Sequence, residues 1–206
     1  ATTAEDGTVE LWSRTQKRIT SMPHIVEELE RLYDAVGDPS WKPDGELYRH
    51  GMTFEQLTRF IRHKTPQPGH EIVEYHLYDM VDNACFRERS AKLAEVLSKT
   101  PRVKVVYVPT FFVEDESEVM RMHKEFRALG YEGTIGRRLG RGYEHKRTDH
   151  LLKLKDFKDA EFRALRIEES RGKYAGTAKR VVCQMPDGRE FTATMSGTIE
   201  HVRDLY

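Results

Sequence analysis

The feature that most constrains the fold is a short alternating segment in the last third of the chain. In LLKLKDF (151–157), two lysines alternate with leucines. Because successive side chains of a strand point to opposite faces, Lys153 and Lys155 share one face. Leu152 and Leu154 then point to the other face, where we expect a core. Two ammonium groups held side by side favour a dianionic partner, of which phosphate is the usual one.

Carboxylates follow the same rule in two other segments. In DGELY (44–48), Asp44 and Glu46 share one face of a strand, where they repel each other unless a cation or a donor lies between them. Glu132 precedes Gly133 at the start of another extended segment and is a candidate ligand for a hard metal ion. Oxygen ligands favour magnesium over zinc, and the two cysteines form no CxxC pair. Together these segments predict one groove for phosphate, a divalent metal and a polar sugar.

The rest of the chain predicts a mixture of helices and strands. Helical spacing of apolar residues predicts helices over residues 22–36, 53–63, 85–100 and 115–130. Turn residues and alternation predict a hairpin over 2–14 and strands over 43–51, 70–81 and 103–113. After residue 157 the pattern changes to short strands over 160–170, 176–186 and 190–197. We therefore expect an α+β fold with a small all-β module beginning at residue 158.

Charge is balanced over the whole chain but not locally. Lys+Arg and Asp+Glu number 34 each, so the net charge indicates no partner. From Arg137 to Lys158, however, Lys and Arg outnumber acids eight to three, a pattern typical either of a solvated surface or of a nucleic-acid contact. No apolar run is long enough to span a membrane, so we expect no membrane partner. We expect a monomer in a reducing cytoplasm, with the nucleus left open.

Taken in order, these segments resemble the covalent nucleotidyltransferases, and most closely the compact ATP-dependent DNA ligases of phages, viruses and bacteria. SRTQK (13–17) resembles the arginine-bearing segment that follows the nucleophile strand. DGELY resembles the third family motif, and EYHLYDMV (74–81) resembles the strand whose aromatic residue stacks on the nucleobase. EGTIGR (132–137) and LLKLKDF resemble the fourth and fifth motifs.

The resemblance implies both a fold and a reaction. The fold would be a nucleotidyltransferase (adenylation) domain over residues 1–157, with antiparallel sheets and flanking helices, followed by a partial β-barrel OB fold over 158–206. The reaction would seal nicks in double-stranded DNA through lysyl-AMP and DNA-adenylate, with ATP and Mg²⁺ as cofactors.

The resemblance also implies a role for each matching residue. Those facing the nucleotide would be Arg14 for the ribose or the 5′-phosphate of the nick, Asp44 for the ribose, Glu46 for the ribose and metal, Tyr78 for stacking on adenine, Glu132 for the metal, and the catalytic Lys153 and Lys155 for the α-phosphate. Those contacting DNA would be Arg14, Arg137, Arg138, Arg141, Lys146, Arg147, Lys173 and Arg180.

One family feature is not found at its expected place. The nucleophilic lysine of the family lies in a KxDG motif before the arginine segment. No such motif precedes Arg14, and we expect the chain to contain no KxDG motif. We therefore expect the nucleophile segment and the end of the OB fold to be missing, and the chain alone to be inactive. An RNA ligase and an mRNA-capping guanylyltransferase share the acid and lysine motifs. A non-catalytic DNA-end-binding module would need only the basic segment, so these three alternatives stay open.

Overall fold

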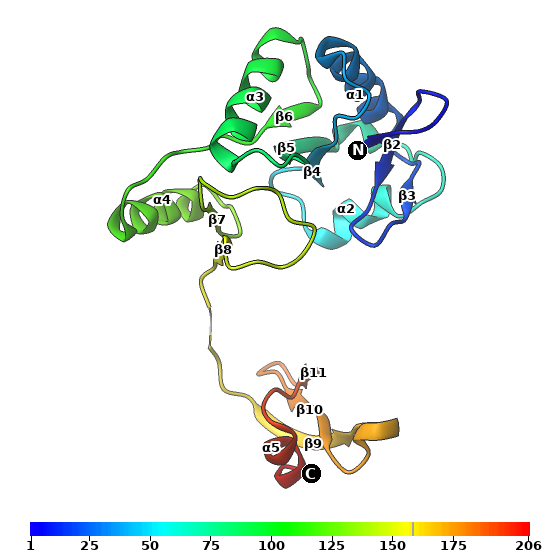
Figure 1. Ribbon diagram of the computed structural model, residues 1–206. Helices are drawn as coiled ribbons and strands as arrows, with labels where there is room; N and C mark the ends of the chain where they lie inside the picture. Colours follow the sequence, from blue (N-terminus) through cyan, green and yellow to red (C-terminus); the bar gives the residue numbers. More distant parts are fainter. Residues whose placement is uncertain (158) are drawn as a thin grey trace. The chain divides into compact units, whose positions relative to one another are not determined.

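The computed structural model of the protein describes residues 1–157 and 159–206 (Figure 1). They form two compact units, Ala1–Lys155 and Asp156–Tyr206. The predicted domain boundary falls on residue 158, which lies outside the described residues.

The first unit is built from small sheets and four helices. Its sheets are β1 (Thr2–Thr3), β2 (Val9–Trp12) and β3 (Arg18–Ile19); β4 (Pro43–Tyr48), β5 (Glu74–Met80) and β6 (Val105–Tyr107); and β7 (Thr134–Arg137) with β8 (Leu151–Leu154). Its helices are α1 (Pro23–Val36), α2 (Phe54–Ile61), α3 (Phe86–Lys99) and α4 (Glu116–Ala128), with a 3₁₀ turn η1 (His70–Ile72). All pairings are antiparallel except β5 with β6, which is parallel.

Local sequence accounts for the helix ends. Pro23 occupies the first turn of α1, where a missing N–H costs nothing, and Gly37 ends the helix with a φ of 69°. Thr53 caps α2 by accepting the N–H of Gln56, while the Gln56 side chain accepts the N–H of Thr53. This reciprocal pair is a capping box, and it fixes the start of α2 at Thr53.

The central strand β5 separates a core face from a second, half-buried face. Tyr75, Leu77 and Asp79 are buried, and α3 packs on β5. His76 and Tyr78 alternate with them on the second face and are half-buried. Figure 1 shows α1 and α3 together above the sheet, with β7 and β8 below it. The second face is therefore the one that can carry a site.

The second unit is an open antiparallel sheet with one short helix. Its strands are β9 (Arg163–Glu169), β10 (Ala178–Gln184) and β11 (Glu190–Thr194), with β10 in the centre. A 3₁₀ turn η2 (Gly172–Tyr174) precedes β10, and α5 (Ile199–Asp204) follows β11. Over the described residues these strands close no barrel. The prediction of a mixed fold with antiparallel sheets and flanking helices is confirmed. Among the described helices, none combines the length and apolar character needed to cross a bilayer.

Two expectations about strands were wrong. Leu152 does not enter a core: its side chain is 56% exposed, while Leu154 is half-buried. The reason is that β7 and β8 form only a two-stranded sheet, whose helical neighbour α4 contacts β7. The strand predicted over 103–113 is also shorter, since only Val105–Tyr107 pairs with β5. The apolar residues after it, Phe111 and Phe112, are exposed.

Candidate functional site

The two lysines of the alternating segment converge on one carboxylate. In the β7–β8 pair, Ile135 lies opposite Lys153, and this register brings the start of β7 to the end of β8. Lys153 Nζ lies 3.3 Å from Glu132 Oε2, and Lys155 Nζ donates a hydrogen bond to Glu132 Oε1. All three side chains are exposed, that of Glu132 by 69%. The structure therefore brings the predicted metal ligand and the predicted phosphate-binding lysines together.

The electrostatics of this exposed group follow from its geometry. Hydrogen bonds from Lys155 and then Lys153 lower the pKa of Glu132. The same hydrogen bond from Lys155 to Glu132 raises the pKa of Lys155. Gly133 allows the close approach, because a Cβ at that position would overlap the carbonyl of Leu154 on β8. The close packing of the two strands therefore explains why a glycine follows Glu132.

A second group surrounds a cavity of about 240 Å³ beside β4. Arg14, from the loop between β2 and β3, lines it together with Asp44 and Glu46. Between these acids, Gly45 has no room for a side chain, since a Cβ would lie 2.7 Å from the carbonyl oxygen of His76. Three residues that the sequence placed at one site therefore share one cavity.

Tyr78 lies at an irregularity of the central sheet. Asp44 pairs with Asp79, and the next residue, Gly45, pairs with Leu77, so Tyr78 has no cross-strand partner in β4. Such bulges redirect side chains and are frequent beside active sites. Burial raises the pKa of the Tyr78 hydroxyl, and the Asp44 carboxylate adds to the rise. The ring is half-buried on the face of β5 that is turned away from the core.

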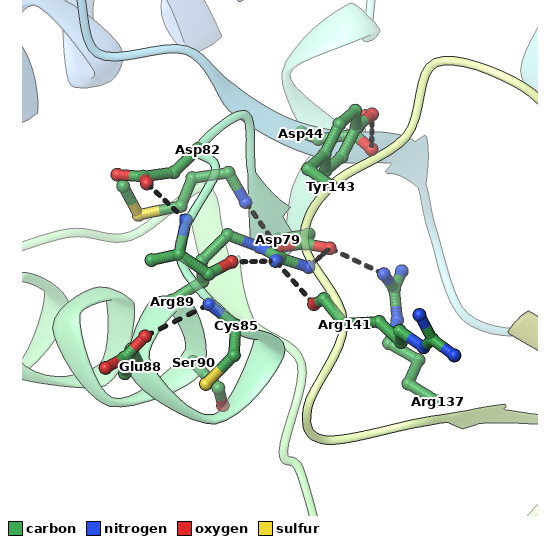
Figure 2. Close-up of polar contacts among 12 residues, drawn as sticks. Asp44, Asp79, Asp82, Cys85, Glu88, Arg89, Ser90, Arg137, Arg141 and Tyr143 are labelled. Carbon is green, nitrogen blue, oxygen red and sulfur yellow. Dashed lines mark hydrogen bonds and ion pairs between the residues drawn. The ribbon is translucent and has the colours of Figure 1, made fainter. Parts of the chain in front are cut away.

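The bulge places two carboxylates opposite each other, and each has its own partner. Asp44 Oδ2 accepts a hydrogen bond of 2.7 Å from the Tyr143 hydroxyl, in the loop between β7 and β8. Asp79 is fully buried and is bound by two arginines, as Figure 2 shows. Because unpaired like charges directly opposite each other destabilise a sheet, these partners explain how the acidic pair is tolerated.

The buried ion pair between Asp79 and Arg89 also anchors the basic loop that follows β7. Arg89 of α3 donates from Nε to Asp79 Oδ1 at 2.8 Å and from Nη2 to Oδ2 at 3.1 Å. Its Nη1 donates to the carbonyl oxygen of Arg141 at 3.0 Å. Arg137 Nη1 donates to Asp79 Oδ2 at 2.6 Å (Figure 2). Arg89 therefore holds the backbone of the loop to α3, and Arg137 holds the end of β7 to β5.

The predicted DNA-contacting cations have different surroundings. Arg137 faces inward toward Asp79. Lys146 is 75% exposed and pairs with Glu144, while Arg147 is exposed. In the second unit, Lys173 lies over the Tyr174 ring, and Arg180 pairs with Glu168 at 3.0 Å. The remaining members, Arg14, Arg138 and Arg141, are exposed. The structure thus separates one member, Arg137, from the solvent-facing ones.

Sequence reasoning missed the buried Asp79–Arg89 pair and Tyr143. Tyr143 carries no motif signal beyond its place after a glycine. An acid at the buried register of β5 could have identified Asp79, because a buried charge needs a partner.

The expectation that the chain contains no KxDG motif was wrong. Lys42-Pro43-Asp44-Gly45 has the KxDG spelling, although it lies after Arg14 rather than before it. Lys42 is exposed, and its carbonyl accepts the N–H of Val81 immediately before β4 begins. Since its Asp-Gly already belongs to the third-motif segment, the absence of the nucleophile segment stays a prediction.

A known protein family matches the whole of the first unit. The family model described as "ATP dependent DNA ligase domain" matches residues 1–155. The chain belongs to this family of ATP-dependent DNA ligase domains. The resemblance inferred from the ordered motifs is therefore confirmed.

Individual relatives agree with the family. A DNA ligase of African swine fever virus is 28% identical over 200 residues, covering 92% of this chain and 46% of the viral protein. A DNA ligase of Haemophilus influenzae is 24% identical over 147 residues, covering 71% of this chain and 54% of the relative. The chain thus spans about half the length of these relatives.

Solved ligase structures share the fold. A structure described as a Lig E DNA ligase superposes with a TM-score of 0.77 at 23% identity, covering 95% of this chain and 74% of that one. The ATP-dependent DNA ligase of bacteriophage T7, in complex with ATP, superposes with a TM-score of 0.58 at 18% identity, covering 93% of this chain and 69% of that one. At these identities the likeness concerns the fold alone.

Proposed function

We propose that this chain is the nucleotide-binding and DNA-facing part of an ATP-dependent DNA ligase that seals nicks in duplex DNA. Membership of the ligase family already implies the use of ATP. The observation that carries the proposal is the convergence of Lys153 and Lys155 on Glu132 at an exposed edge. Such a group can exchange a carboxylate for a phosphate, because its ammonium groups are already side by side and open to solvent.

The lysines would act on the α-phosphate of the nucleotide. In the free protein, Glu132 balances one of their two charges and keeps both side chains at the same edge. On nucleotide binding, the ammonium groups would turn to the phosphate oxygens, whose charge develops further in the transition state. Preorganised cations at such a position stabilise the transition state more than the ground state.

The carboxylates fit a magnesium ion that is shared with the nucleotide. Over the described residues, no three metal-ligating side chains form a cluster. Magnesium is usually held by one or two carboxylates together with substrate phosphates and water, which is what Glu132 and Glu46 can offer. When bound, the ion would neutralise phosphate charge. The lysines would then provide the remaining positive charge.

The cavity beside β4 suits the sugar. Arg14, Asp44 and Glu46 supply polar groups to one space of about 240 Å³. Tyr78 would stack on adenine from the half-buried face of β5. Arg14, which is exposed, would reach either the ribose or the 5′-phosphate at the nick.

The basic residues would bind the DNA backbone. In the first unit, the best placed are four exposed residues, Arg138, Arg141, Lys146 and Arg147. Lys173 and Arg180 would do the same in the second unit. We further propose a monomer acting on nicked DNA in the cytoplasm. The named relatives are DNA ligases, which favours this function over an RNA ligase, a capping enzyme or a binding module.

Adenylylation of the full-length protein tests the proposal. Incubation with α-labelled ATP should label the protein with AMP, and the labelled protein should seal nicked duplex DNA. A GMP label from GTP would instead indicate a capping enzyme, and DNA binding without any label would indicate a binding module. Lys42→Ala should leave the label in place, because we expect the nucleophile in another segment. Loss of the label in that variant would identify Lys42 as the nucleophile.

A further inference from the structure

Arg137 has the surroundings of an internal support rather than of a surface cation. Its Nη1 lies 2.6 Å from Oδ2 of Asp79, a side chain with 0% exposure. The Arg137 side chain itself is only 17% exposed. A phosphate contact through Nη1 would require this group to leave a buried carboxylate, which costs far more than the small gain from an exposed ion pair.

The same guanidinium lies over aromatic rings. Its central carbon is 5.3 Å from the centroid of the Tyr78 ring and 5.0 Å from that of Phe86. A guanidinium stacks on aromatic rings more readily than an ammonium because it is planar and weakly hydrated. Arg137 therefore links the Asp79 carboxylate to the Tyr78 ring through one rigid group.

Tyr78 needs such a support more than its neighbours do. At the bulge it has no cross-strand partner in β4, so the sheet by itself leaves its side chain less constrained than those of Leu77 and Asp79. The ring is half-buried, so part of it stays accessible while Arg137 covers another part. A cation behind a ring that stacks on a base holds the ring in place.

We propose that Arg137 is a positioning residue that holds the Tyr78 ring for nucleobase stacking, and that it makes no contact to the DNA backbone. This rests on the proposed function, because it takes adenine as the partner of Tyr78. The chain of contacts runs from Arg89 on α3, through Asp79 and Arg137, to the ring. Arg147, exposed and without an ion pair among the described residues, represents the opposite kind of arginine.

Three variants of the full-length protein test the assignment. Arg137→Met keeps the aliphatic volume and removes the charge. Arg137→Lys keeps the charge, and so a partner for Asp79, but removes the planar group. Arg147→Met removes an exposed cation and serves as the contrast. The measurements are the ATP dependence of adenylylation, the stacking-induced quenching of a 2-aminopurine nucleotide, and the salt dependence of binding to nicked DNA.

The expected results separate the two roles. Arg137→Met should raise KM for ATP about fivefold with kcat nearly unchanged and should weaken the quenching, and Arg137→Lys should do so partially. Neither should alter the slope of log K against log salt. Arg147→Met should lower that slope by about one.

Other results overturn the proposal. A lower salt slope in Arg137→Met, or an unchanged KM for ATP in both Arg137 variants, would mean that Arg137 does not position Tyr78. If Arg137→Met fails to fold, the lysine variant decides. A wild-type protein that forms no AMP adduct would contradict the proposed function instead, so the two failures are distinguishable.

Discussion

Two groups in this molecule have the same composition of charge and opposite surroundings. In the first group, the Asp79 carboxylate lies between two cations, Arg89 and Arg137. In the second group, the Glu132 carboxylate lies between Lys153 and Lys155. The Asp79 carboxylate is fully buried, whereas the Glu132 side chain is 69% exposed. Burial makes the first group permanent, because replacing either partner by water would cost a large part of the free energy of folding. Exposure makes the second exchangeable, as a phosphate-binding group must be.

The cations of the two groups differ in a way that suits these roles. Arginine offers a planar fork that binds a carboxylate at two points, which Arg89 does on Asp79. Lysine is a flexible point charge that can turn from one anion to another. The comparison teaches that charge stoichiometry does not identify a site; solvent access and the type of cation do.

The largest expected effect comes from breaking the buried group. Asp79→Asn should lower the free energy of unfolding by about 3–5 kcal/mol, because it leaves two arginines with no carboxylate. Denaturant unfolding measures this loss. Asp187→Asn, which removes the exposed partner of Arg189, is the matched control and should barely move the midpoint. Equal midpoints for the two variants would mean that the Asp79 group is not structural.

The exposed group should behave in the reverse manner. Lys153→Ala should reduce the rate of adenylylation of the full-length protein about 10²–10³-fold, through the loss of transition-state stabilisation, with little change in unfolding. Lys99→Ala removes another exposed lysine that is paired with a glutamate, Glu95, and should leave the rate unchanged. Normal adenylylation by Lys153→Ala would refute the phosphate-binding assignment.

A smaller effect is expected at the hydrogen bond that joins β4 to the loop after β7. Tyr143→Phe should cost about 1 kcal/mol of stability, since Asp44 loses a donor in a partly buried position. Burial and the nearby Asp44 raise the pKa of the Tyr143 hydroxyl, so it remains a donor at neutral pH. Tyr206→Phe, which removes an exposed hydroxyl bonded to Glu169, is the control. Denaturant midpoints that match within error would show that the loop is held without Tyr143.

The smallest effect concerns pH. Because the lysines lower the pKa of Glu132 below its unfolded value, the stability from this group is fully present above the unfolded pKa. It is lost as pH falls through the lower folded pKa. The stability difference between wild type and Glu132→Gln should therefore shrink below about pH 4, and 1 M salt should remove most of it at neutral pH. A difference that grows on acidification would have the wrong sign for this group.

Much of the fold could be predicted from local pattern. The cap at Thr53, the proline in the first turn of α1 and the alternation of β5 are read from neighbouring residues, and the structure agrees with each. The exposure of Leu152 could not be predicted this way. Alternation indicates which side chains share a face, but it does not indicate whether anything covers that face.

The candidate site shows the same limit. Glu132 and the two lysines could be associated because motif order and alternation place them on neighbouring strands. Arg137 and Arg138 look equivalent in the sequence, yet Arg137 faces the buried Asp79, which lies 58 residues away along the chain. Nothing in either local sequence indicates that partner.

The sequence by itself determined the order of the motifs, the ends of the helices and the family, because these depend on residues within a few positions of one another. Tertiary structure decided which carboxylate became permanent and which stayed exchangeable. That choice depends on how much water each charge keeps after the chain has folded. Hydration of a charge is set by residues distant in sequence, here those of α3 and β7 that enclose Asp79.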